Sequence, residues 1–140
     1  MLGANFETVG WPASGEMDIM EQTGQDKTRT SAAMHFPDNS GGNGPTNSIE
    51  NITSTTEFHN YAVEWTAESI KFSVDDEFFF SYDNSADIPF NSDFFIILNV
   101  AMGGTLGGTI DPAFTEDVME IDYVRAVSYT HLTLPTILLV

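Results

Sequence analysis

The stretch Gly10-Trp11-Pro12-Ala13-Ser14-Gly15-Glu16-Met17-Asp18-Ile19-Met20-Glu21 carries three carboxylates among apolar neighbours. Glu16 and Asp18 are two residues apart, with Met17 between them and Ile19 after them. Successive side chains of a β-strand point to opposite faces of a sheet, so this alternation predicts a strand with both acids on one face. Negative charge on an inward face is costly unless something in the protein uses it.

Glu21 raises a question of parity. It lies five residues after Glu16, which in a regular strand would place its side chain on the opposite face. One β-bulge around Ile19-Met20 would absorb a residue and return Glu21 to the face of Glu16 and Asp18. Two carboxylates on either side of a sugar are what glycoside hydrolysis requires. The alternative for the same spacing is an exposed strand whose acids face water.

Composition indicates one all-β domain. The chain has 140 residues and is 12% aromatic, with eleven phenylalanines, and clusters of turn residues separate its short apolar runs. The pair Asp75-Asp76 predicts a tight turn, and Phe94–Val100 is typical of a strand buried on both faces. Residues 36–58 are polar, which indicates a long surface loop. The expected strands are Gly15–Met20, Thr30–His35, Tyr61–Thr66, Ser69–Val74, Glu77–Tyr82, Phe94–Ala101 and Met119–Ala126.

Charge and composition exclude several classes of partner and site. Twenty-one acids against four bases give a formal net charge of −17, which repels phosphate backbones and anionic membranes but leaves neutral substrates unaffected. We therefore expect no nucleic acid partner and no membrane partner. The chain has no cysteine, so neither a disulfide nor a thiolate site can form. No apolar run reaches the roughly 18 to 20 residues that span a bilayer.

The stretch from Gly10 to Glu21 resembles the active-site signature of the family 16 glycoside hydrolases, Glu-x-Asp-x-x-Glu in its bulged form. Later segments are similar to the family in the same order, and the resemblance is greatest to the laminarinases, endo-β-1,3-glucanases. These segments are Phe58–Thr66, Ile70–Asp75, Phe94–Gly104 and Met119–Arg125. The resemblance implies a β-sandwich of jelly-roll type (concanavalin A-like), whose concave face forms an open cleft for a neutral β-glucan.

The resemblance also implies roles for the three acids. Glu16 would be the nucleophile and Glu21 the acid/base, in a mechanism that retains anomeric configuration through a covalent glycosyl-enzyme. Asp18, between them, would adjust the proton balance of the pair. All three carboxylates are present, which favours an enzyme over a non-catalytic glucan-binding module of the same fold. Transglycosylation, mixed-linkage glucan and agar-type galactans stay open as alternatives.

The other candidates rest on the resemblance as well. Trp11 would stack on a glucose ring near the cleavage point or pack beside the strand. His35 corresponds to a histidine of the cleft, and Asn99 would point into the cleft from an otherwise apolar strand. Asp122 lies where many relatives bind a structural calcium. No cofactor is expected for catalysis.

The signature begins at residue 10, whereas the family's domain normally begins well before it. We therefore expect residues 1–129 to be the C-terminal part of a family 16 catalytic domain, incomplete at its N-terminus and weak or inactive by itself. Residues 130–140 contain no acid and are expected to be a non-native tail. We expect an extracellular or periplasmic monomer, although this sequence shows no signal peptide.

Overall fold

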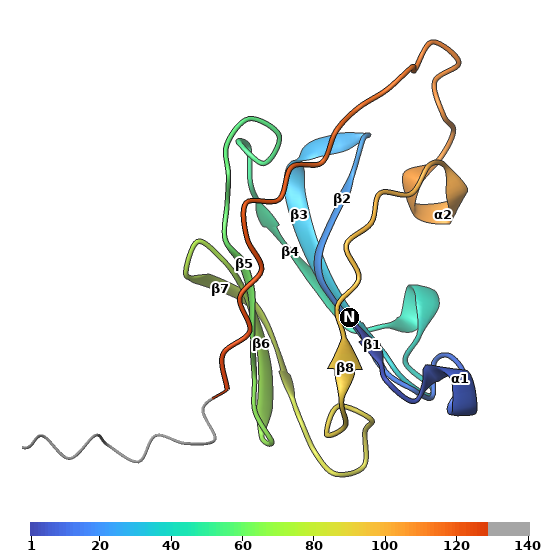
Figure 1. Ribbon diagram of the computed structural model, residues 1–140, viewed down its shortest axis with the longest axis vertical. Helices are drawn as coiled ribbons and strands as arrows, with labels where there is room; N and C mark the ends of the chain where they lie inside the picture. The colour runs from blue at the N-terminus through green and yellow to red at the C-terminus, as the bar shows by residue number, and fades with distance from the viewer. Residues whose placement is uncertain (129–140) are drawn as a thin grey trace, which may run out of the picture.

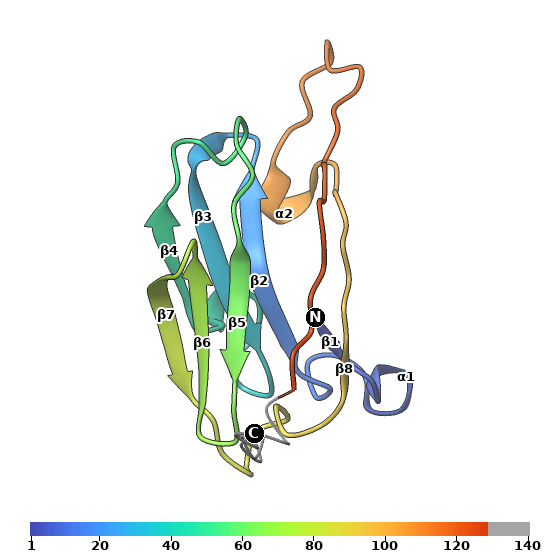
Figure 2. The same ribbon diagram turned by 60° about the vertical axis from the view of Figure 1, so that its left-hand side comes forward.

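The computed structural model, which describes residues 1–128, consists of two antiparallel β-sheets packed face to face (Figures 1 and 2). The five-stranded sheet has the order β4-β3-β2-β1-β8, and the three-stranded sheet has the order β5-β6-β7. The first sheet contains β1 (Leu2–Gly3), β2 (Glu16–Thr23), β3 (Asp26–His35), β4 (Thr46–Glu50) and β8 (Phe94–Phe95). The second contains β5 (Tyr61–Trp65), β6 (Ser69–Val74) and β7 (Glu77–Asp83). Three short helical turns complete the described elements: α1 (Phe6–Val9), η1 (Gly41–Asn43) and α2 (Gly104–Gly107). The predicted all-β sandwich is confirmed.

The core lies between the two sheets and is built by alternation along their strands. On β3, Thr30, Ala32 and Met34 are buried, so Ser31 and His35 lie on the other face of the sheet. The central buried cluster consists of Met17, Ala32, Met34, Phe36, Ile70, Phe72 and Phe90. Because these side chains fill the interior, the opposite face of β2 and β3 is left for polar groups.

The predicted hairpin between β6 and β7 is confirmed. Val74 pairs with Glu77, so Asp75 and Asp76 form a two-residue turn. Both aspartates have positive φ, 49° and 69°. Positive φ at both central residues is the geometry that joins strands of right-handed twist.

The prediction of one long loop over residues 36–58 was wrong, because β4 lies within it. β4 pairs with β3 from Arg29↔Glu50 to Ala33↔Thr46 and forms the edge of the five-stranded sheet. An edge strand has one neighbour, so polar side chains such as Asn47 can remain in contact with solvent. Its composition therefore resembles that of a loop.

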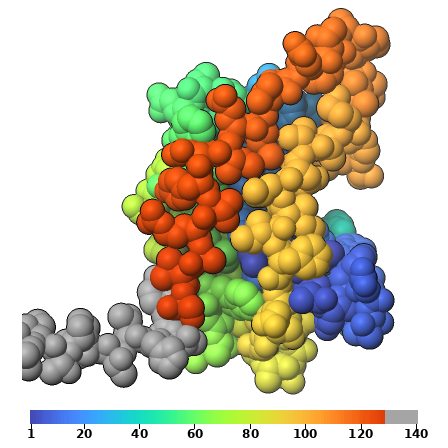
Figure 3. All heavy atoms as spheres, viewed as in Figure 1, coloured from blue at the N-terminus to red at the C-terminus, as the bar shows by residue number. Residues whose placement is uncertain are grey.

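The predicted strand Phe94–Ala101, buried on both faces, was also wrong. β8 ends at Phe95, and the side chains that follow are largely exposed, with Leu98 at 55% and Val100 at 67%. β8 pairs only with the two-residue β1, so beyond Phe95 no strand among residues 1–128 supplies a ladder. The extended residues 96–103 and 118–128 lie on the face shown in Figure 3, in gold and red.

The predicted strand Met119–Ala126 is not formed either, because its backbone pairs with no other strand among residues 1–128. The predicted tail over residues 130–140 lies outside the described residues. No helix in the described part of the chain is long and apolar enough to cross a membrane.

Candidate active site

The predicted bulge is present in β2 and determines where Glu21 points. Asp18 pairs with Ala33 and Glu21 pairs with Ser31, so three steps along β2 oppose two steps along β3. The extra residue falls at Ile19-Met20. Glu16, Asp18 and Glu21 therefore occupy one face of the sheet, opposite the buried Met17. The first structural expectation about the acids is confirmed.

The neighbouring strand leaves room around two of these acids. The residues opposite Asp18 and Glu21 on β3 are Ala33 and Ser31, whose side chains are small. Directly paired residues of an antiparallel ladder share a face of the sheet. The carboxylates of Asp18 and Glu21 thus lie beside short side chains on the same face of the sheet.

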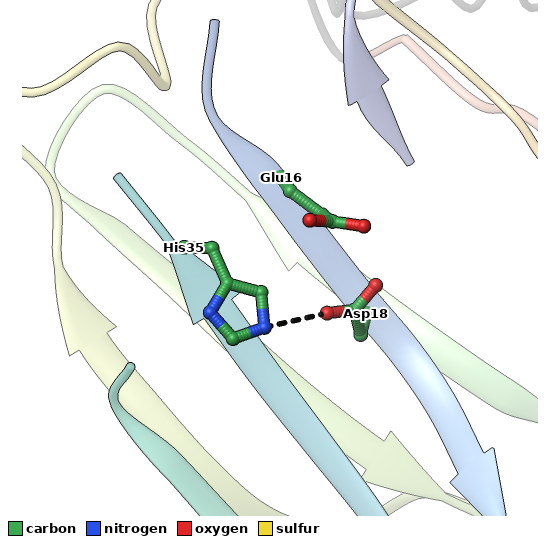
Figure 4. A group of neighbouring side chains, drawn as sticks. All are labelled: Glu16, Asp18 and His35. Carbon is green, nitrogen blue, oxygen red and sulfur yellow. Dashed lines mark ion pairs between the residues drawn. The ribbon is translucent and has the colours of Figure 1, made fainter. Parts of the chain in front are cut away.

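Glu16 and Asp18 each have a polar contact that holds them. The indole Nε1 of Trp11 donates a hydrogen bond of 2.6 Å to Glu16 Oε2. Nε2 of His35 lies 3.2 Å from Asp18 Oδ2, and Figure 4 shows these side chains facing one another across β2 and β3. The ring centroids of Trp11 and His35 are 6.0 Å apart. Trp11 and His35 are therefore brought to the acids, while binding of a sugar by either residue stays a prediction.

The electrostatics of the three carboxyls are coupled. Burial, with the nearby charges of Glu16 and Glu21, raises the pKa of Asp18 from its ordinary 3.8 to about 7. Burial also raises the pKa of Glu21; His35 opposes this and Glu16 adds to it. A raised pKa favours the protonated form of a carboxyl, which is the form that a general acid needs. The face therefore carries Glu21, whose pKa is raised, together with Glu16.

Glu16, Asp18 and His35 are also the one group in residues 1–128 whose ligand atoms are close enough to share a metal ion, all within 4.8 Å. A metal on Nε2 of His35 would require the ring proton on Nδ1, which is buried and has no partner among the described residues. Histidine ligands of metals almost always donate that second N–H. The donor set therefore does not fit a metal ion.

Two predicted residues lie apart from this cluster. Asn99 is exposed in the extended segment after β8, and it makes no hydrogen bond to another described residue. Asp122 is exposed in the extended segment near the end of the described chain. It does not belong to a group of three potential ligand side chains among residues 1–128. Binding of substrate by Asn99 and of calcium by Asp122 both stay predictions.

A small hollow adjoins Glu21 on the side away from Glu16. Its walls include Ser31, Arg29 and Asp26 from β3 and Leu106 from α2. None of these four residues was predicted as a site residue from the sequence. The pairing of β2 with β3 sets Ser31 opposite Glu21, so the register of this hairpin is the signal that identifies Ser31.

Comparison with known proteins agrees with this arrangement. The model of glycosyl hydrolases family 16 matches residues 4–125. A glucan endo-1,3-beta-glucosidase of Cryptopygus antarcticus is 32% identical over 89% of this chain and 53% of its own length. A beta-glucanase of Rhodothermus marinus is 36% identical over 86% of this chain and 46% of its own length. The chain spans about half the length of the curated relatives it matches.

A solved structure is similar in fold as well as in sequence. It is a variant of LamA from Z. galactanivorans in complex with laminaritriose and laminaritetraose, with a TM-score of 0.72 and 36% identity. The likeness covers 81% of this chain and 51% of that one, and it confirms the jelly-roll type of the sandwich. The acids, their bulged strand and the match over most of the chain agree: this chain belongs to glycosyl hydrolases family 16.

Proposed function

We propose that this chain provides the catalytic face of an endo-β-1,3-glucanase that retains anomeric configuration, with Glu16 as nucleophile and Glu21 as acid/base. The observation that carries the proposal is the bulge at Ile19-Met20, which sets Glu21 on the face of Glu16 and Asp18. The raised pKa of Glu21 supports its role as the acid. In retaining enzymes the two carboxyls are about 5 Å apart, a spacing that residues on one strand can reach.

The proposed reaction has two steps. First, Glu21 gives its proton to the glycosidic oxygen while a Glu16 oxygen attacks the anomeric carbon, which forms a glycosyl ester and releases the leaving sugar. Then Glu21, now a carboxylate, takes a proton from water, and the water oxygen displaces Glu16. Glu21 regains its proton and Glu16 its charge, so the cycle closes. A sugar hydroxyl in place of water would give transglycosylation.

A neutral β-glucan is the substrate class that the charge and the relatives support. The net charge of −17 disfavours polyanionic polysaccharides, and the two relatives described above, from Cryptopygus antarcticus and Rhodothermus marinus, are named for glucans. The LamA variant binds laminaritriose and laminaritetraose, both oligosaccharides. We further propose that the protein is a monomer. We propose that it is extracellular or periplasmic, because polymeric glucans are found outside the inner membrane.

Covalent trapping is the sharpest test, because mass spectrometry detects a single labelling event even when turnover is slow. A 2-deoxy-2-fluoro laminaribiosyl fluoride should lose fluoride and add one fluorinated disaccharide to the purified chain, and peptide mapping should find it on Glu16. Glu16→Gln should abolish labelling and hydrolysis of laminarin but keep glucan binding in affinity electrophoresis, because the amide keeps the size of the side chain.

Glu64→Gln is the matched control, since Glu64 is a surface acid that pairs with Lys71 at 3.5 Å on the other sheet. This variant should label and bind like the original chain. Labelling of another residue, or normal labelling of Glu16→Gln, would refute the assignment of the nucleophile. Glucan binding with neither labelling nor hydrolysis would identify a binding module instead.

A further inference from the structure

We propose that Leu106, held in place by Gln25, is a specificity-determining residue that favours hydrolysis over transglycosylation. It narrows the hollow beside Glu21, so that water rather than a second sugar displaces Glu16 from the glycosyl-enzyme. Hydrolysis and transglycosylation share their first step and differ only in this displacing molecule. The proposal therefore rests on the proposed function and concerns its second step.

The hollow lies on the side of Glu21 from which the second step begins. Displacement inverts the anomeric carbon, so the attacking oxygen approaches from the side opposite its bond to Glu16. Glu21 must be within reach of that oxygen to take its proton. On β2 the hollow is lined by residues 21–23, and neither Glu16 nor Asp18 lines it. An attacking molecule in the hollow would thus be beside the base and away from the nucleophile.

The size of the hollow suits water. Its volume is about 130 Å³. Pockets that hold small-molecule ligands usually measure about 300–1,000 Å³, whereas one molecule of liquid water occupies about 30 Å³. The hollow therefore has room for several waters and is too small for a sugar unit.

The floor of the hollow can hold water without a strong charge. Ser31 lies opposite Glu21 on the same face, and its hydroxyl can both donate and accept a hydrogen bond. The guanidinium of Arg29 is paired within the hollow, since its Nε lies 3.4 Å from Asp26 Oδ2. Its Nη1 also donates a hydrogen bond of 3.2 Å to Ser48 Oγ. The hollow is thus polar but close to neutral.

Leu106 is the one apolar side chain among the residues that line the hollow. It cannot hydrogen-bond to a sugar hydroxyl, so a sugar pressed against it would lose hydrogen bonds to water without replacement. Leu106 is 59% exposed, so it forms a wall of the hollow and is not part of the core. Shortening this side chain would widen the hollow with little effect on folding.

Gln25 fixes the segment that carries Leu106. Its Nε2 donates a hydrogen bond of 2.8 Å to the carbonyl oxygen of Gly107. A Cβ added at Gly108 would overlap the same Nε2, and the φ of Gly108 is 70°, so glycine is required there for both reasons. Gln25 lies in the turn between β2 and β3, and α2 lies beside β2 (Figure 2). The wall is therefore attached to the hairpin that carries Glu21.

The trapped glycosyl-enzyme allows the second step to be measured alone, even where turnover is slow. The whole 140-residue chain, labelled with 2-deoxy-2-fluoro laminaribiosyl fluoride and freed of reagent, is followed by mass spectrometry as it loses the label. The rate with added laminaribiose, divided by the rate in buffer alone, measures the preference for a sugar over water. Leu106→Ala should raise this ratio by at least about threefold, because it widens the hollow. Gln25→Ala should raise it in the same direction, because it releases α2.

Two controls separate the wall from a general effect of substitution. Leu106→Met keeps the volume of the side chain and should keep the original ratio. Leu98→Ala is the matched control, because Leu98 is exposed to a similar extent, 55%, and does not line the hollow. It should also leave the ratio unchanged.

Each contrary result has a distinct meaning. Normal labelling with an unchanged ratio in Leu106→Ala would overturn this proposal and leave the proposed function intact. An equal rise in Leu98→Ala would overturn it too. A ratio that rises in Leu106→Ala but not in Gln25→Ala would remove Gln25 from the proposal. If the original chain takes no label, the proposed function fails, and this proposal fails with it.

Discussion

Asp18→Asn should make the protein more stable at neutral and alkaline pH. Asp18 is largely buried, and its pKa is raised from the ordinary value of 3.8 to about 7 by burial and by Glu16 and Glu21. Below pH 4 the carboxyl is protonated in both the folded and the unfolded chain, so it does not lower the free energy of unfolding. Between pH 4 and 7 the folded chain keeps the proton and the unfolded chain loses it. Stability therefore falls as pH rises through this window, and the loss is complete above pH 7.

The size of the effect follows from the same values. A rise in pKa from 3.8 to about 7 corresponds to an upper figure of about 4 kcal/mol, at ~1.4 kcal/mol for each pH unit. Part of this free energy comes from the charges of Glu16 and Glu21 beside Asp18 rather than from its burial. We expect Asp18→Asn to raise the free energy of unfolding at pH 8 by at least about 2 kcal/mol. At pH 3.5 the two proteins should be equally stable.

Urea unfolding of the original chain and of Asp18→Asn, each at pH 3.5, 5.5 and 8, measures this directly. The difference between the two proteins should grow steadily with pH. Asp87→Asn is a suitable control, because Asp87 is exposed and its substitution should change the free energy of unfolding little. A constant difference between Asp18→Asn and the original chain across the three pH values would refute the reasoning, since it would mean that Asp18 titrates normally in the fold.

Three further predictions concern the same strand and the chain end. Trp11→Phe keeps an aromatic ring but removes the 2.6 Å hydrogen bond to Glu16, so kcat on laminarin should fall by about tenfold while glucan binding persists; an unchanged kcat would exclude a role for the indole N–H. Deleting Met20 removes the extra residue of the bulge and leaves Glu21 two positions after Asp18, so the acids should stay on one face and the melting temperature should change by only a few degrees; unfolding would show that the bulge itself is required. Deleting residues 130–140 should leave the free energy of unfolding unchanged, and a large loss in denaturant titration would show that these residues belong to the fold.

The acids could be placed from the sequence because their arrangement depends on nearby residues. Alternation puts Glu16 and Asp18 on one face, and the odd spacing to Glu21 requires a bulge if all three are to work together. Both statements concern one strand and its hairpin neighbour, β3, which follows after a short turn. The contact between His35 and Asp18 needed the register as well, and the register became known only from the structure.

Composition did not predict the edge strand β4. Thr46–Glu50 reads as a loop because four of its five side chains are polar, yet the backbone pairs with β3 along five residues. An edge strand has a neighbouring strand on one side only, and its other side is in contact with water. Polar side chains therefore do not prevent its backbone from pairing. Hydrophobic periodicity therefore finds central strands more readily than edge strands.

For Phe94–Val100 the sequence predicted a strand that the structure largely lacks. Its apolar composition is that of a central strand, but only its first two residues enter a ladder, and Val100 is 67% exposed. A sequence determines how strongly a segment tends to form a strand, whereas a strand exists only when a second backbone lies about 4.8 Å away. β2 meets this condition through β3, which reaches it by a short hairpin turn, so the face that carries Glu16 and Glu21 forms without the later segments. The residues that were predicted correctly are thus those whose partners lie close in the chain, and the acids of the proposed active site are among them.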